Sequence, residues 1–412
     1  MNVKKIILLL IAFFLFIPSR SFGAGFLIYS QDASAAGSCI TFTAQVDNPS
    51  AVFYNPAAIN RLEGTNISLG STIILPFTSF KSASTGKETD MEHHIYLLPS
   101  VYITHKFNDK FSAGIGLFSP FGLSTEWPNN WEGRYLSTFA SLRTVYLNPV
   151  VSWQINPQLS TAVGFSIIKS EIEQKKAVSF WPLPVSDGRT KLEADGTSVG
   201  FNLALLYQCP PYFDLGISYR SKVSIHYKGD VENKAPKYLS KVLPKGDVSV
   251  DIDLPPIVAA GIATSLIKNL TIEAELYWIG WSTYDELKAD FEEPVQKVFK
   301  PFVAPVVRDY HDVFTYGVGI KYQLNLSWVI RCGYLFDRTP VPEKAVDPIL
   351  PDADRDEYSA GLYYTGEKYK LGLAYYGVFG RDRKVENNLN DFNGEYKISS
   401  HLIAVSFEYR LK

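Results

Sequence analysis

Residues that could carry out chemistry are few and widely spaced along this 412-residue chain. The three cysteines, Cys39, Cys209 and Cys332, form no CxxC pair, which argues against a zinc ribbon and against a thioredoxin-like redox motif. None of the six histidines lies in an HExxH or GxSxG context. We therefore predict no catalytic residue, no metal site and no cofactor.

The charged residues suggest a different chemistry, the neutralisation of an acid. A carboxylate held away from water needs a cation or several hydrogen-bond donors. Where side chains alternate between two faces, one face of several segments carries basic residues, namely Arg220, Lys222, His226, His311, Lys321 and Arg331. The alternative is an ordinary ladder of charge pairs with acids such as Asp214, Glu273, Glu275 and Glu408, and the sequence leaves both interpretations open.

The elements that position these residues are long strands. In residues 213–228, odd positions are mostly apolar and even positions mostly polar or charged, which is the period of a β-strand. The alternation lasts sixteen residues, whereas a strand of a soluble protein averages about five or six. A strand that crosses a membrane needs roughly nine to eleven residues. Aromatic residues make up 14% of the chain and charged residues 20%, which fits a membrane β-barrel.

The strand count and the connections agree with that class. We predict fourteen strands near 66–75, 94–106, 111–119, 139–155, 159–176, 192–208, 213–229, 246–265, 270–288, 309–323, 327–340, 355–366, 369–385 and 395–411. Connections of nine to twenty residues alternate with connections of two to four. Outer-membrane barrels have this arrangement, with short periplasmic turns and long outside loops. The predicted fold is all-β, a 14-stranded antiparallel transmembrane barrel over 66–412.

The N-terminal region divides into two parts. Lys4 and Lys5 precede an apolar run over 6–17, which predicts a signal peptide over 1–23, cleaved before Ala24; an uncleaved anchor is the alternative. Removing 1–23 takes three basic residues from a net charge of −2, leaving −5. Residues 24–65 lack alternation, and a barrel of fourteen strands would leave a channel that such a segment could plug. We predict a hatch there; a periplasmic tail is the alternative.

A series of short motifs now suggests a family. They are Ala24-Gly25-Phe26, Asn55-Pro56-Ala57, Ser119-Pro120-Phe121-Gly122-Leu123 with Trp127, Trp131 and Gly133-Arg134-Tyr135, Asn148-Pro149, Tyr219-Arg220-Ser221, Lys228-Gly229, Leu254-Pro255, Trp281-Ser282, Pro340-Val341-Pro342, and Leu350-Pro351-Asp352 with Arg355. In order and spacing the chain resembles the FadL family of outer-membrane long-chain fatty-acid transporters, over nearly all of 24–412. The resemblance implies a barrel plugged by an N-terminal hatch. It also implies a groove between the third and fourth outside loops, a pocket inside the barrel, and sideways exit at a kinked third strand.

Site residues follow from the loops and from this resemblance. The loops at 177–191 and 230–245 contain apolar residues that line a predicted outer groove or form the loops' own core, and we leave both open: Phe180, Trp181, Leu183, Val185, Tyr238, Leu239, Val242 and Leu243. The resemblance places Phe26, Lys169 and His311 at the inner pocket, although Lys169 shares parity with apolar residues and needs a bulge to turn inward. Inward parity adds Arg220 as a further pocket residue. Asn55, Pro56 and Ala57 form the hatch motif. Gly114, Gly116 and Pro120 mark the predicted lateral gap.

The predicted function is passive uptake of hydrophobic molecules across a Gram-negative outer membrane, with long-chain fatty acids as the first candidate. Aromatic hydrocarbon uptake is the alternative, and an outer-membrane lipid hydrolase, an adhesin barrel and a diffusion porin are the rival classes. The expected partners are a hydrophobic small molecule and outer-membrane lipid, and we expect a monomer. The chain has no basic block, so we predict no nucleic-acid partner.

Overall fold

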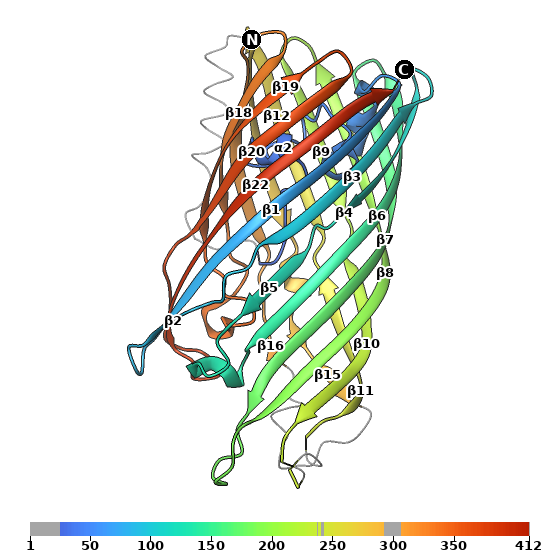
Figure 1. Cartoon of the computed structure of the whole chain (residues 1–412). Coiled ribbons are helices and arrows are strands. Elements are labelled where there is room, and N and C mark those ends of the chain that lie inside the picture. The colour runs from blue at the N-terminus through green and yellow to red at the C-terminus, as the bar shows by residue number, and fades with distance from the viewer. Residues whose placement is uncertain (1–24, 237, 240–242, 292–305, 412) are drawn as a thin grey trace.

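The computed structural model describes residues 25–236, 238–239, 243–291 and 306–411 (Figure 1). The predicted signal peptide and Val242 lie outside the described residues. Described residues form one closed antiparallel barrel, whose first strand β1 (Thr65–Ser82) pairs with the last strand β22 (Gly394–Leu411) from Thr65 opposite Leu411 to Ser82 opposite Gly394. The predicted 14-stranded all-β fold is confirmed.

The wall continues from β1 in chain order. Its other strands are β3 (Tyr96–Lys106), β4 (Phe111–Phe118), β5 (Gly122–Glu126), β6 (Phe139–Asn156), β7 (Leu159–Val178), β8 (Gly188–Cys209), β9 (Phe213–Arg220), β10 (Val223–Lys234), β11 (Gly246–Leu254), β12 (Ile257–Ile267), β13 (Leu270–Ile279), β15 (Ala289–Phe291), β17 (Val313–Gln323), β18 (Trp328–Asp337), β19 (Arg355–Thr365) and β20 (Tyr369–Gly380). Short strands and 3-10 turns decorate the long connections, namely β2 (Glu88–Asp90), β14 (Glu286–Leu287), β16 (Val306–Val307), β21 (Arg383–Val385), η2 (Glu132–Tyr135), η4 (Trp281–Thr283) and η6 (Glu343–Ala345).

Alternation of side chains builds the two faces of the wall. On β7, Val163, Phe165 and Ile167 are exposed on the outer face, while Gly164 and Ser166 between them are buried. This is the arrangement that a strand with lipid on one side and a filled lumen on the other requires. The short turns lie at the end of the barrel that carries the C-terminus, and the long connections lie at the opposite end (Figure 1).

The predicted strands at 213–229 and 246–265 are each interrupted, the wall continues past the predicted end of 111–119 after a break, and all three breaks reverse the faces. Between β9 and β10 the chain breaks at 221–222; before the break Arg220 is buried, and after it Val223 and Ile225 are buried. Lys222 and His226 are therefore exposed, and the prediction that they face inward is wrong because it assumed unbroken alternation. Similar breaks separate β4 from β5 and β11 from β12.

The N-terminal segment, residues 25–64, lies inside the barrel and is almost entirely buried. It contains α2 (Ala33–Ala36), α3 (Ala51–Tyr54) and η1 (Pro56–Arg61), and α2 lies within the ring of strands in Figure 1. Wall glycines make room for its backbone: a Cβ at Gly216 would lie 2.4 Å from the Thr43 carbonyl oxygen, and a Cβ at Gly333 would lie 2.4 Å from the Ser38 backbone. None of the helices in the described residues is both long and apolar enough to cross a membrane.

Candidate ligand-binding site

A cavity of about 440 Å³ lies inside the barrel, on the long-loop side of the N-terminal segment. Much of its lining is apolar, from residues that include Phe26, Leu98, Phe121, Leu123, Leu142, Val378 and Leu402. Its size falls in the range of about 300–1,000 Å³ that is common for pockets binding small molecules. The cavity is therefore a candidate site for a hydrophobic ligand.

The cavity reaches the lipid-facing surface through a gap in the wall. β3 pairs with β4 over Val101–Lys106, and β5 pairs with β6, but within the described residues no pairing joins β3 to β5. Leu97 is 68% exposed and Val145 is 46% exposed on the outer face, yet both line the same cavity as the buried Phe26. The opening thus lies between residues 97–100 and residues 119–123, beside a hydrogen bond of 2.9 Å that the Tyr96 hydroxyl donates to the Ser124 hydroxyl.

The start of the N-terminal segment pairs with the break between β4 and β5. Ile28 donates its backbone N–H to the Pro120 carbonyl at 2.7 Å, and Gly122 donates its N–H to the Phe26 carbonyl at 3.1 Å. The buried Gln31 side chain donates to the Ser119 carbonyl at 2.9 Å and accepts from the Ser119 N–H at 3.1 Å. These bonds satisfy backbone groups that the interrupted sheet leaves unpaired.

Phe26 belongs to an aromatic cluster at one wall of the cavity. Its ring centroid lies 4.8 Å from that of Trp281, 5.5 Å from Tyr284 and 6.0 Å from Phe121, all in edge-on geometry. Such contacts hold the segment's first residues against the wall and leave apolar surface toward the cavity. The structure therefore places Phe26 at the inner cavity.

A second cavity of about 170 Å³ adjoins the first and shares Leu123 and Leu142 with it. Val231, Val250 and Ile252 line it because the breaks before β10 and after β11 turn their apolar faces inward. The buried ion pair between Arg308 and Asp347, at 2.7 Å, lies at its edge. The two cavities therefore meet at Leu123 and Leu142, and the larger one ends at the gap in the wall.

One end of the larger cavity is polar. Asp337, Arg355, Glu357 and Tyr376 line it, and Asp337 and Arg355 are directly opposite on β18 and β19. Arg355 forms an ion pair with Asp352 and donates to the Gly25 carbonyl at 3.1 Å. The Asp352 carboxylate in turn accepts the Gly25 N–H at 3.2 Å. This network fixes the first described residue of the N-terminal segment beside the cavity.

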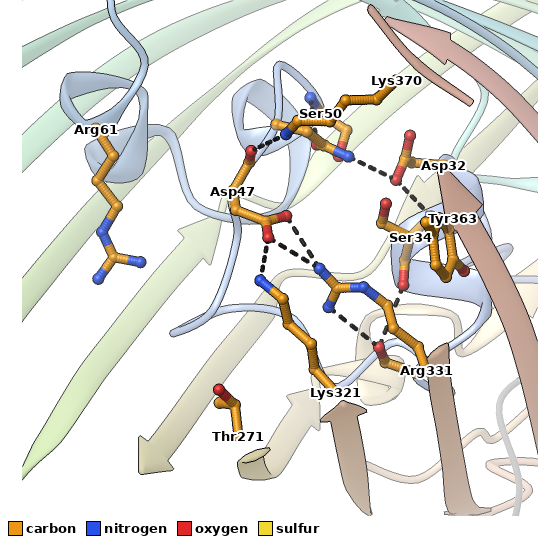
Figure 2. A network of polar contacts seen from close by, with 12 residues as sticks. Asp32, Ser34, Asp47, Ser50, Arg61, Thr271, Lys321, Arg331, Tyr363 and Lys370 are labelled. Atoms are coloured by element: carbon orange, nitrogen blue, oxygen red, sulfur yellow. Dashed lines mark hydrogen bonds and ion pairs between the residues drawn. The ribbon is translucent and has the colours of Figure 1, made fainter. Parts of the chain in front are cut away.

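On the short-turn side, an ionic network fixes the N-terminal segment to the wall (Figure 2). The Asp47 carboxylate pairs with Lys321 and, at 3.0 Å, with Arg331, and the Asp47 carbonyl accepts from Lys370 at 3.0 Å. Burial on its own would raise the pKa of the Asp47 carboxyl, but Lys321, Arg331 and Lys370 together hold that pKa well below its usual value. Lys321, Arg331 and Lys370 thus bind the N-terminal segment and lie outside the lining of the 440 Å³ cavity.

Two buried acids of β13 hold the middle of the N-terminal segment. The Glu275 carboxylate accepts from the Phe42 N–H at 2.6 Å and the Thr43 N–H at 3.0 Å. Glu273 accepts from the Ala44 N–H at 2.7 Å. Non-helical backbone inside a membrane protein needs such partners because it has no ladder of its own. These donors, and the Thr43 hydroxyl that also donates to Glu275, all belong to the N-terminal segment and carry no charge, so the charge-ladder alternative does not describe these two acids.

The predicted hatch motif also makes anchoring contacts. The Asn55 side chain accepts from the Ala57 N–H at 3.1 Å, which caps η1, and donates to the Leu205 carbonyl of β8 at 3.1 Å. Pro56 occupies the first turn of η1, where its missing N–H has no cost. The Ala57 carbonyl accepts from the Ser160 hydroxyl at 3.0 Å. The motif therefore ties the segment to β7 and β8.

The structure separates the basic residues that were predicted at the inner pocket. Arg220 faces inward but packs on the N-terminal segment, 3.3 Å from the Phe53 carbonyl, outside the lining of the large cavity. Lys169 is exposed on the outer face and pairs with Glu171 at 3.2 Å, because β7 has no bulge there. His311 is exposed and precedes β17, so strand parity does not apply to it. The geometry contradicts the inward placement of Lys169 and His311.

The predicted outer-groove residues lie on two loops that pack against each other. Phe180 and Leu243 are buried with Val178, and Val185 and Leu239 pack on them. Trp181, Leu183 and Tyr238 are exposed. The loops' own core thus accounts for the buried members, and none of the described residues of the predicted groove lines either apolar cavity.

The predicted gap residues have two different positions. Pro120 lies in the break itself. Gly114 and Gly116 lie within β4 and are paired on both sides, with Thr104 and Tyr102 of β3 and with Val150 and Asn148 of β6. Cβ atoms at Gly114 and Gly116 would lie 2.8 Å and 3.0 Å from the Val52 side chain. These two glycines therefore accommodate the N-terminal segment, and the gap begins after Phe118.

Sequence reasoning missed the polar end of the cavity and the role of Gln31. Asp337 and Glu357 have inward parity at the outer ends of their strands, a signal that could have found them. Residues 196–200 also match GxSxG, but they lie in the middle of β8, where Ser198 donates to the Ser224 carbonyl at 2.6 Å. A nucleophile elbow requires a sharp strand-to-helix turn, so this match has no catalytic meaning.

Comparisons with known proteins agree with this architecture. Residues 14–411 match the family described as outer membrane protein transport protein (OMPP1/FadL/TodX). The long-chain fatty acid transport protein of Escherichia coli O6:H1 is 24% identical over 384 residues, covering 84% of this chain and 85% of that protein. A Pseudomonas aeruginosa FadL homologue has a similar structure, with a TM-score of 0.84 at 19% identity, covering 94% of this chain and 100% of that one. The Ralstonia pickettii toluene transporter TbuX gives a TM-score of 0.73 at 17% identity, covering 93% of this chain and 100% of that one.

Proposed function

Since the chain belongs to the FadL/TodX family of outer-membrane transport proteins, we propose that it carries long-chain aliphatic molecules passively through the two cavities and out sideways between β3 and β5. The predicted family is confirmed, and with it a barrel of the Gram-negative outer membrane whose family transports hydrophobic compounds and is not enzymatic.

The observation that carries the proposal is the continuity of the large cavity with the lipid-facing surface. Buried Phe26 and exposed Leu97 line one space, so a ligand could move from lumen to lipid without crossing water. Each methylene transferred from water into such a space is stabilised by about 0.8 kcal/mol. A route through the opposite end would have to displace the anchored N-terminal segment, with its buried Glu275 and Arg331 contacts.

The shape of the space favours a chain over a compact ring. The second cavity extends the first beyond Leu123 and Leu142, which suits an elongated molecule. The long-chain fatty acid transport protein among the relatives supports this choice. Aromatic hydrocarbon is the second candidate, supported by the toluene transporter and by the aromatic cluster around Phe26. We also propose that the N-terminal segment plugs the lumen against ions.

Filling the gap tests the proposed route. Ser119 lines the cavity at the break. The Ser119→Trp variant should reduce uptake of radiolabelled oleate and hexadecanol at least tenfold, because the larger side chain fills the gap. The control variant Ala360→Trp, on the exposed outer face of β19, should leave uptake unchanged. Undiminished uptake by a folded Ser119→Trp protein would contradict the lateral route. Uptake of toluene in preference to both long-chain probes in the unaltered protein would favour the aromatic candidate.

A further inference from the structure

The polar end of the large cavity contains two unpartnered charged groups of opposite hydrogen-bonding character, and the buried Tyr29 hydroxyl of the same lining also has no partner among the described residues. Asp337 is 1% exposed; one carboxylate oxygen accepts from the Thr315 hydroxyl at 2.6 Å, and the other, Oδ2, has no partner within the described residues. The Nε donor of Arg355 likewise has no partner there. Directly opposite residues on neighbouring strands have Cβ atoms about 4.5–5.5 Å apart, so one small group could meet both.

The other ionisable groups at this end already have partners, and most of them are carboxyl groups. Arg355 is paired with Asp352, and Glu357 accepts from the Tyr376 hydroxyl. Among the described residues, three carboxyl groups, those of Asp337, Asp352 and Glu357, thus surround one guanidinium. The fourth charged residue of the lining, Arg143, lies at the exposed outer mouth, where solvent and lipid head groups weaken its field.

A hydroxyl group complements this end of the cavity better than a carboxylate does. A hydroxyl donates one hydrogen bond and accepts others, whereas an ionised carboxylate only accepts. A hydroxyl can therefore donate to Asp337 Oδ2 and accept from Arg355 Nε. A carboxylate would add another negative group beside Asp337 and Asp352, and repulsion between like charges in a water-poor site is strong.

We propose that the polar end of this cavity recognises the hydroxyl head of a long-chain alcohol in preference to the carboxylate of a fatty acid of the same length. The assignment rests on the proposed function, since it names the head group of a molecule whose chain lies in the apolar part of the same cavity. Asp337 and Arg355 bind the head, and Asp352 and Thr315 position them.

Equilibrium binding of three matched probes tests the assignment. We would measure the binding of radiolabelled 1-dodecanol, dodecanoate and dodecane to the full chain in lipid nanodiscs at pH 8. The expected order is 1-dodecanol tightest, at least tenfold tighter than dodecanoate. Dodecanoate binding as tightly as 1-dodecanol, or equal binding of all three probes, would overturn the head-group assignment and leave the proposed passage of aliphatic chains intact. Failure of all three probes to bind would overturn the proposed function itself.

Substitutions test whether Asp337 causes the preference for 1-dodecanol over dodecanoate. Asp337→Asn should weaken 1-dodecanol binding and narrow the tenfold preference to less than threefold. Asp253→Asn removes an acid of an exposed ion pair with Lys222 and should leave all three affinities unchanged. Should Asp337→Asn fail to fold, Thr315→Val removes the hydroxyl that orients Asp337 and should narrow the preference in the same direction. A full tenfold preference in a folded Asp337→Asn protein would contradict the role of this acid.

Discussion

The two halves of the barrel lumen hold their contents in opposite ways. On the short-turn side, the N-terminal segment is held by charges and by hydrogen bonds to its backbone, through Asp47, Glu275 and Asn55. On the long-loop side, the lumen is an apolar space whose wall is interrupted between β3 and β5. The difference teaches that the inward cations of this barrel fix the segment, so their presence is no evidence for an acidic ligand.

Removal of the backbone anchor on β13 should have the largest effect on the N-terminal segment. Glu275→Ala leaves the N–H groups of Phe42 and Thr43 buried without a partner, and each such loss costs about 1–3 kcal/mol. We expect the N-terminal segment to loosen by about 3–5 kcal/mol in total, with faster amide exchange at residues 42–44 and higher ion conductance in planar bilayers. Glu171→Ala, at an exposed position on the outer face, is the control and should change neither. Unchanged exchange and conductance would show that the segment does not depend on this acid.

Gln31 connects the two halves, because it lies in the N-terminal segment and bonds the break in the wall. Gln31→Leu removes two hydrogen bonds to the partly buried backbone of Ser119, which should destabilise the break by about 2–3 kcal/mol. Amide exchange should accelerate at residues 119–122 while residues 42–44 stay protected. Equal acceleration in both places would mean that the two halves open as one unit.

A substitution at Gly114 tests whether this glycine makes room for the N-terminal segment or forms part of the lateral gap. Gly114→Phe drives a side chain against Val52, and overpacking of this kind costs about 1–3 kcal/mol. We expect weaker protection of α3 in amide exchange, with long-chain uptake retained, in contrast to Ser119→Trp. Loss of uptake without any change in α3 would instead assign the gap to this glycine, as the sequence predicted.

The smallest expected effect is the response of the Asp47 network to pH. The folded pKa of Asp47 lies below its unfolded value of about 4, so its stabilising contribution is complete above that value and is lost as the pH falls toward the folded pKa. The Asp47 side chain keeps 36% of its area exposed. Because of this exposure we expect about 1 kcal/mol. Protease cleavage within residues 25–64 should be constant from pH 8 to 5 and increase only below about pH 4. If cleavage within residues 25–64 already increased near neutral pH, the pH response would have to come from a group other than Asp47.

The sequence was sufficient to predict the barrel but not its interior. Alternation and loop length predicted the strands and the turns because every membrane strand obeys the same two-faced rule, as β7 shows. The break at 221–222 was hidden because one or two residues reverse a face without altering composition, and this misplaced Lys222 and His226. The break at 119–121 was expected only through the family resemblance, which placed a kink and Pro120 there. The cavity could not be predicted because it forms where Phe26, Asp337 and Leu123, far apart in sequence, meet in space.

The most direct test of the account is to map where a ligand touches the protein during passage. A long-chain alcohol carrying a diazirine at its distal end, photolysed with cells that express the protein, would label residues that mass spectrometry can identify. We expect labels on 96–100 and 119–124, on both sides of the gap, and along the cavity to Leu142. Labels concentrated on Asp47, Lys321 and Lys370 at the opposite end would contradict lateral passage and indicate a route past the N-terminal segment.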